Sequence, residues 1–221
     1  MTTPSQAAKG VLFDLDGTLL DTADDLGSAL NHVLNQRDFP SIKPERYRPV
    51  ASDGAKGLLE LGFGQQLTQF CYDELRAEFL AYYQHHIADN TCLYPGVEQL
   101  LNTLNQRNIP WGIVTNKPEG LTLSLLPHFP EFAQCKVVVG GDTLPTRKPD
   151  PQPLLFAVNE LNIEATDCLY IGDALRDIEA GNRAQMITIV AQWGYIKASD
   201  DTSLWQANYI AENSSDCLTF I

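Results

Sequence analysis

The amino-acid sequence predicts an α/β fold: a doubly wound parallel sheet (Rossmann-like) with an inserted helical cap. Two observations lead to this prediction. Short apolar runs alternate with helical segments along most of the chain, which favours a parallel sheet covered by helices on both faces. One long stretch breaks the alternation and carries helical patterns alone. The composition, with 44% hydrophobic and 19% charged residues, is ordinary for a globular protein.

The predicted sheet begins with Gly10–Phe13, a short apolar run that ends at a glycine-containing turn, residues 14–18. Similar runs follow at residues 111–114, 136–139, 168–171, 187–190 and 209–211. The helical segments between them are residues 96–107, 120–126, 151–161 and 174–183. Pro151 suits the first turn of its helix, where the missing N–H costs nothing.

The stretch that breaks the alternation runs from residue 21 to residue 94 and shows no convincing strand. Apolar residues recur at helical spacing within residues 22–37 and again within residues 73–84. We therefore predict a core domain of residues 1–20 and 95–221 and a helical cap domain of residues 21–94. Residues 199–203, near the end of the chain, are polar and are predicted to form a loop.

The chain is strongly acidic, with 15 Lys+Arg against 28 Asp+Glu and a formal net charge of −13. Such a field repels nucleic acids and anionic membranes, so neither is expected as a partner. An anionic ligand would need a local device, such as a metal ion, a single lysine or a helix N-terminus.

The five cysteines are scattered, with no CxxC pair, which indicates reduced thiols rather than disulfides or a zinc site. Residues 1–8 lack the basic-then-apolar order of a signal peptide, and the chain has no long apolar stretch. We therefore expect a cytoplasmic protein. No obligate interface is visible in the sequence, so we expect a monomer or a weak dimer.

Polar groups follow four successive strands of the predicted sheet. Ligands bind beyond the carboxyl ends of strands in open parallel sheets, so these groups should meet at one edge. The groups, in chain order, are Asp14 and Asp16, then Thr115, Asn116 and Lys117, then Asp142 and Lys148, and finally Asp173 and Asp177.

These residue types suit phosphoryl transfer. Asp14 and Asp173 offer hard oxygen ligands for Mg²⁺, which would let a carboxylate approach a phosphate. Asp14 ends the strand and is the predicted nucleophile, forming an aspartyl-phosphate. Asp16 would protonate the leaving oxygen and later deprotonate the attacking water.

The remaining strand ends would stabilise the phosphoryl group. Thr115 can donate a hydrogen bond to a phosphoryl oxygen, although a threonine here could also cap the next helix. Lys148 can neutralise the developing charge. Asp177 either shares the metal or orients Lys148. Each feature alone has an ordinary explanation, but four strand ends bearing the required groups favour a catalytic site.

These residues resemble the four motifs of haloacid dehalogenase-like hydrolases, which are found here at residues 14–18, Thr115, residues 148–149 and residues 172–177. The resemblance covers nearly the whole chain, with the helical insert where that family's first-site cap belongs. It implies an Mg²⁺-dependent phosphatase in which Thr115 and Lys148 bind phosphate. It also implies that Asp14, Asp173 and the main-chain carbonyl of Asp16 bind the metal.

Within that family, two finer likenesses are present. Residues 140–144 leading to residues 147–151 resemble the phosphoglycolate phosphatase branch. Residues 75–84, 111–118 and 193–196 resemble bacterial N-acetylmuramic acid 6-phosphate phosphatases. Ala174 is a departure, because many relatives have Ser or Asp there, but little effect is expected.

The cap is expected to set the substrate. Residues 52–57 form either a small-residue loop that descends on the cleft or a helix N-terminus, and Lys56 is a candidate for a substrate carboxylate. Together with Thr115, Asn116 and Lys148, it completes the predicted substrate-binding set. Hinges for cap opening are expected near residues 19–21 and 94–96.

The predicted function is hydrolysis of a small phosphorylated metabolite, phosphoglycolate-like or a sugar phosphate. N-acetylmuramic acid 6-phosphate hydrolysis in cell-wall recycling, or a phosphosugar mutase of the β-phosphoglucomutase type, is the alternative. Asp16 argues against the dehalogenase reaction, which needs no acid at that site and no Mg²⁺. A regulatory receiver would need an open site, which the cap disfavours.

Overall fold

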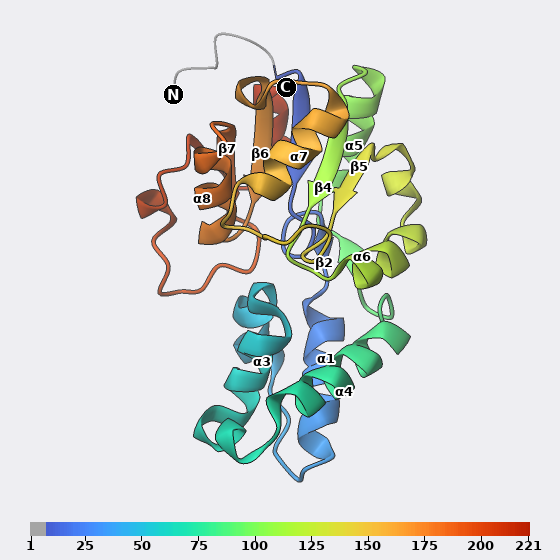
Figure 1. The fold of residues 1–221 in the computed structure, drawn as a ribbon, viewed down its shortest axis with the longest axis vertical. Helices are drawn as coiled ribbons and strands as arrows, with labels where there is room; N and C mark the ends of the chain where they lie inside the picture. Colours follow the sequence, from blue (N-terminus) through green and yellow to red (C-terminus); the bar gives the residue numbers. More distant parts are fainter. Residues whose placement is uncertain (1–7) are drawn as a thin grey trace.

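The centre of the computed structural model, which describes residues 8–221, is a parallel six-stranded sheet (Figure 1). Its spatial order is β5-β4-β1-β6-β7-β8. The strands are β1 Gly10–Phe13, β4 Trp111–Val114, β5 Val137–Val139, β6 Cys168–Gly172, β7 Ile187–Ala191 and β8 Tyr209–Ala211. Every strand predicted from the sequence is present to within one residue at either end, and the predicted fold class is confirmed.

Alternation along β1 explains how the sheet is covered on both faces. Val11 and Phe13 belong to one apolar cluster, whereas Leu12 between them belongs to the other, because successive side chains of a strand point to opposite faces. All four residues of β1 are buried, which accounts for its unbroken apolar sequence. The helices of this part are α5 Val97–Gln106, α6 Glu119–Leu125, α7 Gln152–Leu161 and α8 Leu175–Arg183.

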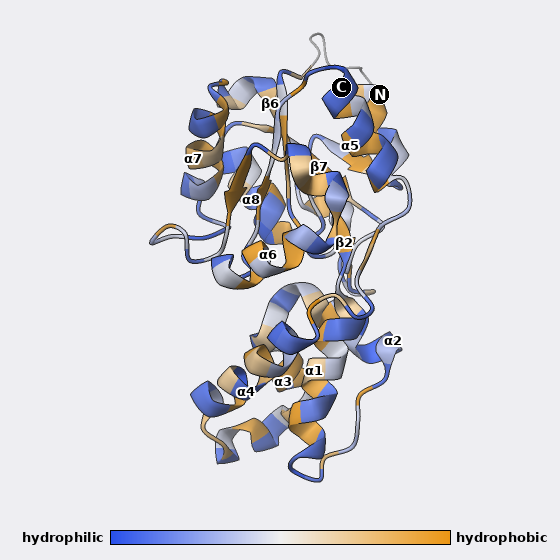
Figure 2. Cartoon of the chain, turned by 90° about the vertical axis from the view of Figure 1, so that its right-hand side faces the viewer, coloured by the Kyte–Doolittle hydropathy of each residue, from blue (hydrophilic) through white to orange (hydrophobic). Residues whose placement is uncertain are grey.

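Four further helices pack together beyond one edge of the sheet (Figure 1). They are α1 Ala23–Asn35, α2 Pro44–Tyr47, α3 Gly54–Phe63 and α4 Tyr72–His85. Figure 2 shows hydrophobic and hydrophilic residues alternating along these helices, as expected where one stripe of a helix is buried. Phe39, Phe63 and Phe70 pack ring against ring at the far end. This arrangement is the reason to retain residues 21–94 as the proposed cap domain.

Two short strands join the sheet to the helical insert. β2 Leu20–Asp21 and β3 Cys92–Leu93 pair antiparallel, with Leu20 opposite Leu93 and Asp21 opposite Cys92. The prediction that residues 21–94 hold no strand is therefore wrong. Strands of two residues are too short to produce a periodic pattern. In the predicted loop at 199–203, a 3₁₀ helix, Thr202–Leu204, is present.

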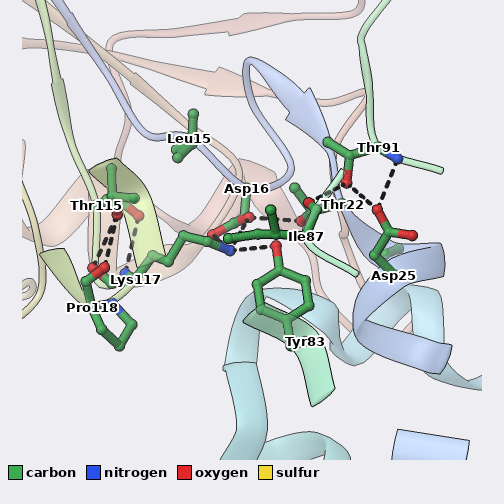
Figure 3. Close-up of polar contacts among 12 residues, drawn as sticks. Leu15, Asp16, Thr22, Asp25, Tyr83, Ile87, Thr91, Thr115, Lys117 and Pro118 are labelled. Atoms are coloured by element: carbon green, nitrogen blue, oxygen red, sulfur yellow. Dashed lines mark hydrogen bonds and ion pairs between the residues drawn. The ribbon is translucent and has the colours of Figure 1, made fainter. Parts of the chain in front are cut away.

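A buried carboxylate fixes the start of α1 to the segment that leads into β3. Asp25 accepts hydrogen bonds from the backbone N–H groups of Asn90 and Thr91, and from both of their side chains. Figure 3 shows the contacts between Thr91 and Asp25. The donors lie 2.6–2.9 Å from the Asp25 oxygens. The segment that enters the helical insert and the segment that leaves it are thus held side by side.

Within residues 8–221, none of the helices has both the length and the apolar character needed to cross a bilayer. Residues 1–7, on which the prediction about a signal peptide and the start of the predicted core domain rest, lie outside the described residues.

Candidate active site

The carboxyl ends of β4, β1 and β6 lie next to one another, and they bring the predicted site residues into one place. Thr115 follows β4, Asp14 follows β1, and Asp173 follows β6. A cavity of about 720 Å³ opens beyond these ends, and both the sheet edge and the helical insert line it. Its volume is typical of sites for small molecules.

Lys148 lies at the centre of the buried charges. Its Nζ is 2.9 Å from Oδ1 of Asp14 and 2.8 Å from Oδ1 of Asp177, with the lysine side chain 1% exposed. The ammonium also donates to the main-chain carbonyl of Val114 and to the Tyr170 hydroxyl, each at 2.8 Å. Of the two roles predicted for Asp177, the contact with Lys148 supports the orienting one, and sharing the metal stays a prediction.

Three carboxylates crowd around this lysine. Asp14, Asp173 and Asp177 each offer an oxygen within 4.8 Å of the others, and all three are buried. Burial and repulsion from Asp14 and Asp177 raise the pKa of Asp173 to about 7. Burial also raises the pKa of Asp14, although Lys148 opposes the shift. One lysine therefore does not fully compensate the cluster.

The donor set fits a divalent cation. Asp173 Oδ2 accepts hydrogen bonds from the backbone N–H of Tyr195 at 2.8 Å and from the Ser52 hydroxyl at 3.0 Å. Its Oδ1 is buried and has no hydrogen-bond partner among the described residues. A bare, buried carboxylate oxygen beside Asp14 is the kind of hard ligand that Mg²⁺ takes.

Asp16 is held in a second polar cluster, which also lines the cavity (Figure 3). Lys117 Nζ lies 3.0 Å from Asp16 Oδ1 and 2.7 Å from the hydroxyl of Tyr83, which α4 supplies. The Thr22 hydroxyl donates to the same Asp16 oxygen at 2.7 Å. Burial disfavours the charge of Lys117, but the Asp16 carboxylate outweighs that effect and raises the lysine's pKa.

Thr115 and Asn116 line the same cavity and also organise its wall. The Thr115 hydroxyl oxygen accepts a hydrogen bond from the backbone N–H of Lys117 at 3.1 Å, but the N-cap residue of the next helix, α6, is Pro118. The Asn116 side chain donates to the Lys148 carbonyl at 2.9 Å. Its Oδ1 is buried without a hydrogen-bond partner among residues 8–221. These contacts fix the loop that carries Lys148.

Residues 52–57 do not form the loop that was one of the two expectations. Ser52 and Asp53 end a 3₁₀ helix, Arg48–Asp53, and α3 starts at Gly54 because Leu58, Leu59 and Phe63 give it a buried face. The segment does line the cleft, and its contact with the buried carboxylates is made by Ser52, which donates to Asp173. The Lys56 side chain lines the cavity but is 74% exposed, with Nζ 4.0 Å from Glu60. Its predicted role in substrate binding stays a prediction.

Several site residues carried no assigned function in the sequence-based prediction. Lys117 stands at a strand end beside Thr115, which was a usable signal. Tyr83 falls on the apolar stripe of α4, so its hydroxyl gave no sign of reaching the site. Arg176 bridges to the insert by donating to the Ser52 carbonyl at 2.8 Å, a contact that no sequence pattern indicates.

Comparisons with known proteins identify the family. The family model for haloacid dehalogenase-like hydrolases matches residues 11–191. A phosphoglycolate phosphatase of Xanthomonas campestris pv. campestris is 43% identical, with 92% of each chain covered. An N-acetylmuramic acid 6-phosphate phosphatase of Pseudomonas aeruginosa is 36% identical and covers 95% of this chain and 93% of its own.

Solved structures share the fold. The crystal structure of a predicted phosphoglycolate phosphatase from Haemophilus somnus superposes with a TM-score of 0.87 at 24% identity, covering 97% of this chain and 98% of that chain. Both finer likenesses inferred from the sequence thus reappear among the similar proteins. From the family match and these relatives, we conclude that the chain belongs to the haloacid dehalogenase-like hydrolase family.

Proposed function

We propose that the chain hydrolyses a small phosphomonoester in two steps, with Asp14 as nucleophile and Mg²⁺ as cofactor. Its class, a phosphoric monoester hydrolase, follows from the family and from relatives named as phosphatases. The observation that carries the proposal is the buried Lys148 ammonium, held 2.9 Å from Asp14 at the cavity that also holds Asp16 and Thr115.

In the first step, a carboxylate oxygen of Asp14 forms a bond to phosphorus and the bond to the ester oxygen breaks. Asp16 delivers a proton to that leaving oxygen, so it departs as a hydroxyl group rather than as an alkoxide. Lys148 stabilises negative charge on the transferring group, because its ammonium is fixed before the substrate arrives. The Thr115 hydroxyl donates a hydrogen bond to a phosphoryl oxygen.

In the second step, water attacks the phosphorus of the aspartyl-phosphate and the bond to the Asp14 oxygen breaks. Asp16 takes a proton from this water, which restores both carboxyl groups and releases inorganic phosphate. The helical insert covers the cavity on the side of Tyr83, which limits the access of other water molecules.

The residues that would hold Mg²⁺ are the side chains of Asp14 and Asp173 and the main-chain carbonyl of Asp16. The unpartnered Oδ1 of Asp173 supports this assignment. When bound, the ion supplies charge neutralisation that allows an anionic nucleophile to approach an anionic substrate.

Phosphoglycolate is the preferred candidate substrate, because a phosphoglycolate phosphatase is among the relatives with 43% identity. N-acetylmuramic acid 6-phosphate is the second candidate, supported by the relative with 36% identity and by a cavity of about 720 Å³ that has room for a sugar. A mutase would use the same residues but return the phosphoryl group to a second hydroxyl. Analysis of the products separates these reactions.

The proposal is tested by phosphate release from phosphoglycolate, N-acetylmuramic acid 6-phosphate and β-glucose 1-phosphate, with Mg²⁺ and with EDTA. We expect Mg²⁺-dependent release with a clear preference for phosphoglycolate. Unchanged release in EDTA would refute the metal assignment. Transfer of phosphate between hydroxyls of β-glucose 1-phosphate, without release, would favour the mutase.

The proposal places the reaction in the cytoplasm, carried out by a monomer or a weak dimer. The five cysteines, all free, support a reducing compartment. Gel filtration with light scattering tests the oligomeric state.

A further inference from the structure

The Lys117–Tyr83 pair has unused hydrogen-bonding capacity beside the reacting groups. Lys117 Nζ has three N–H bonds and three contacts, with Asp16 Oδ1 at 3.0 Å, Asp16 Oδ2 at 3.4 Å and the Tyr83 hydroxyl oxygen at 2.7 Å. The contact at 3.4 Å is longer than a normal hydrogen bond, so an incoming acceptor can take the place of Asp16 Oδ2. Tyr83 accepts from Lys117, and within residues 8–221 no acceptor is found for its own O–H. Both side chains line the cavity, so the Tyr83 O–H and the Lys117 N–H that makes the long contact can both donate to an incoming group.

Lys117 and Tyr83 are shielded from solvent, which strengthens the hydrogen bonds that they can donate. The Lys117 side chain is 5% exposed and Tyr83 is fully buried. Lys117 Nζ also lies 4.4 Å from the centre of the Tyr83 ring, a cation–π contact that fixes the ammonium over the cap residue. In contrast, Lys56, Arg76 and Arg147 line the cavity as exposed residues and are hydrated there.

We propose that Lys117, assisted by the Tyr83 hydroxyl, binds a carboxylate of the substrate. The pair thereby selects phosphomonoesters whose carboxylate is attached to the carbon that bears the ester oxygen, or to the next carbon. The inference rests on the proposed function, since it assigns the substrate class of that same site. Lys117 is a specificity-determining residue in this view, and the core and the cap each supply one donor.

Distances limit the substrates that fit. As the acid, Asp16 must come within about 3 Å of the ester oxygen. Lys117 Nζ is 3.0 Å from Asp16, so it lies within roughly 6 Å of that oxygen. The carboxylate of phosphoglycolate is attached to the ester carbon and falls within this reach. The carboxylate of N-acetylmuramic acid 6-phosphate lies across the sugar ring, where only the exposed cations could meet it.

The charge balance of the pocket also favours a carboxylate. Asp16 partly neutralises Lys117 in the free protein, so the site does not hold a full unpaired cation that would bind any anion tightly. A planar carboxylate can accept from Lys117, in place of Asp16 Oδ2, and from the Tyr83 O–H together. An uncharged amide of the same shape loses the charge-assisted part of both contacts.

The test compares kcat/KM for phosphoglycolate with kcat/KM for phosphoglycolamide, its uncharged analogue, in the wild-type holoenzyme and in three variants. The variants are Lys117→Met, Tyr83→Phe and, as a matched control, Lys136→Met, which removes an exposed lysine next to the amino end of β5. Using the ratio cancels any effect that Lys117→Met has on Asp16, because Asp16 serves both substrates.

We expect the wild type to prefer the carboxylate by roughly 10- to 100-fold, the range for a hydrogen bond to a charged group. Lys117→Met should bring the ratio near one, Tyr83→Phe should lower it in part, and Lys136→Met should keep it. Lys117→Arg should restore part of the preference.

The outcomes separate the inference from the function on which it rests. A preference that survives Lys117→Met would overturn the inference and leave the phosphatase function standing, as would equal use of both compounds by the wild type. Activity on N-acetylmuramic acid 6-phosphate alone would likewise overturn it. Absence of hydrolysis of every phosphomonoester would instead overturn the proposed function.

Discussion

Replacing Lys148 by methionine tests how much the buried charge cluster depends on one ammonium. Methionine keeps most of the apolar stem, so little packing is lost. The variant leaves Asp14 and Asp177 without their contacts at 2.9 and 2.8 Å, and Asp173 remains within the same carboxylate cluster. The effect should therefore be almost wholly electrostatic.

The expected size follows from burial. Removing one partner of a buried ion pair usually costs about 3–5 kcal/mol, against about 0–1 kcal/mol for an exposed pair. Lys148 is 1% exposed and Asp177 is 0% exposed, so the higher range applies. We expect Lys148→Met to lower the free energy of unfolding by about 3–5 kcal/mol in EDTA at pH 8.

The loss should shrink as the pH falls. The pKa of Asp14 is already raised by burial, and without Lys148 it rises further, so the native state takes up protons that the unfolded chain has released. A native state that binds more protons loses stability as the pH rises, and it regains stability on acidification. The deficit at pH 5.5 should be clearly smaller than at pH 8.

Urea unfolding followed by circular dichroism measures these differences, with Lys136→Met as the control that changes a surface lysine. Adding Asp177→Asn to Lys148→Met removes one of the stranded charges and should recover part of the loss. A deficit below about 1 kcal/mol would show that the cluster behaves like a solvated surface pair, which would refute the reasoning.

Three further predictions address the proton carrier, the metal and the link to the insert. Asp16→Asn should slow turnover by roughly 100-fold or more, because the acid and base are lost, and the phosphorylated Asp14 should be detectable by mass spectrometry after acid quench; full activity would contradict the assignment. Protons compete with Mg²⁺ for Asp14 and for Asp173, whose pKa is about 7, so the affinity for Mg²⁺ measured by calorimetry should rise between pH 5.5 and pH 8, and a flat profile would argue against these ligands. Asp25→Ala strands the buried donors of Thr91 and its neighbour and should cost about 2–4 kcal/mol in urea unfolding, whereas a change within about 0.5 kcal/mol would mean that water replaces the carboxylate.

Most of the sheet was predictable from the sequence because its strands are buried on both faces. β1, β4 and β8 lie where the apolar runs lie, and β6 and β7 extend one residue further. A polar residue follows nearly every strand. Because the carboxyl ends of parallel strands meet at one edge of the sheet, the sequence predicted that Asp14, Thr115 and Asp173 lie close together.

The contacts between the sheet and the insert were not predictable in the same way. Tyr83 reaches Lys117 from a helix whose sequence shows only an apolar stripe, and Ser52 reaches Asp173 from an irregular segment. Such contacts depend on the angle at which the two parts meet. No local periodicity records that angle, and β2 and β3, which help to set it, are each two residues long.

The pairing of β2 with β3 brings the two ends of the helical insert together. Asp21 and Cys92 stand opposite each other in that ribbon, so the chain enters and leaves the insert at neighbouring points. Excising the residues between them leaves two ends that a tight turn can join without disturbing the six-stranded sheet. The same junction would accept a different insert whose ends are equally close. The residues proposed for phosphoryl transfer would then face a different insert, through a change at a single place in the gene.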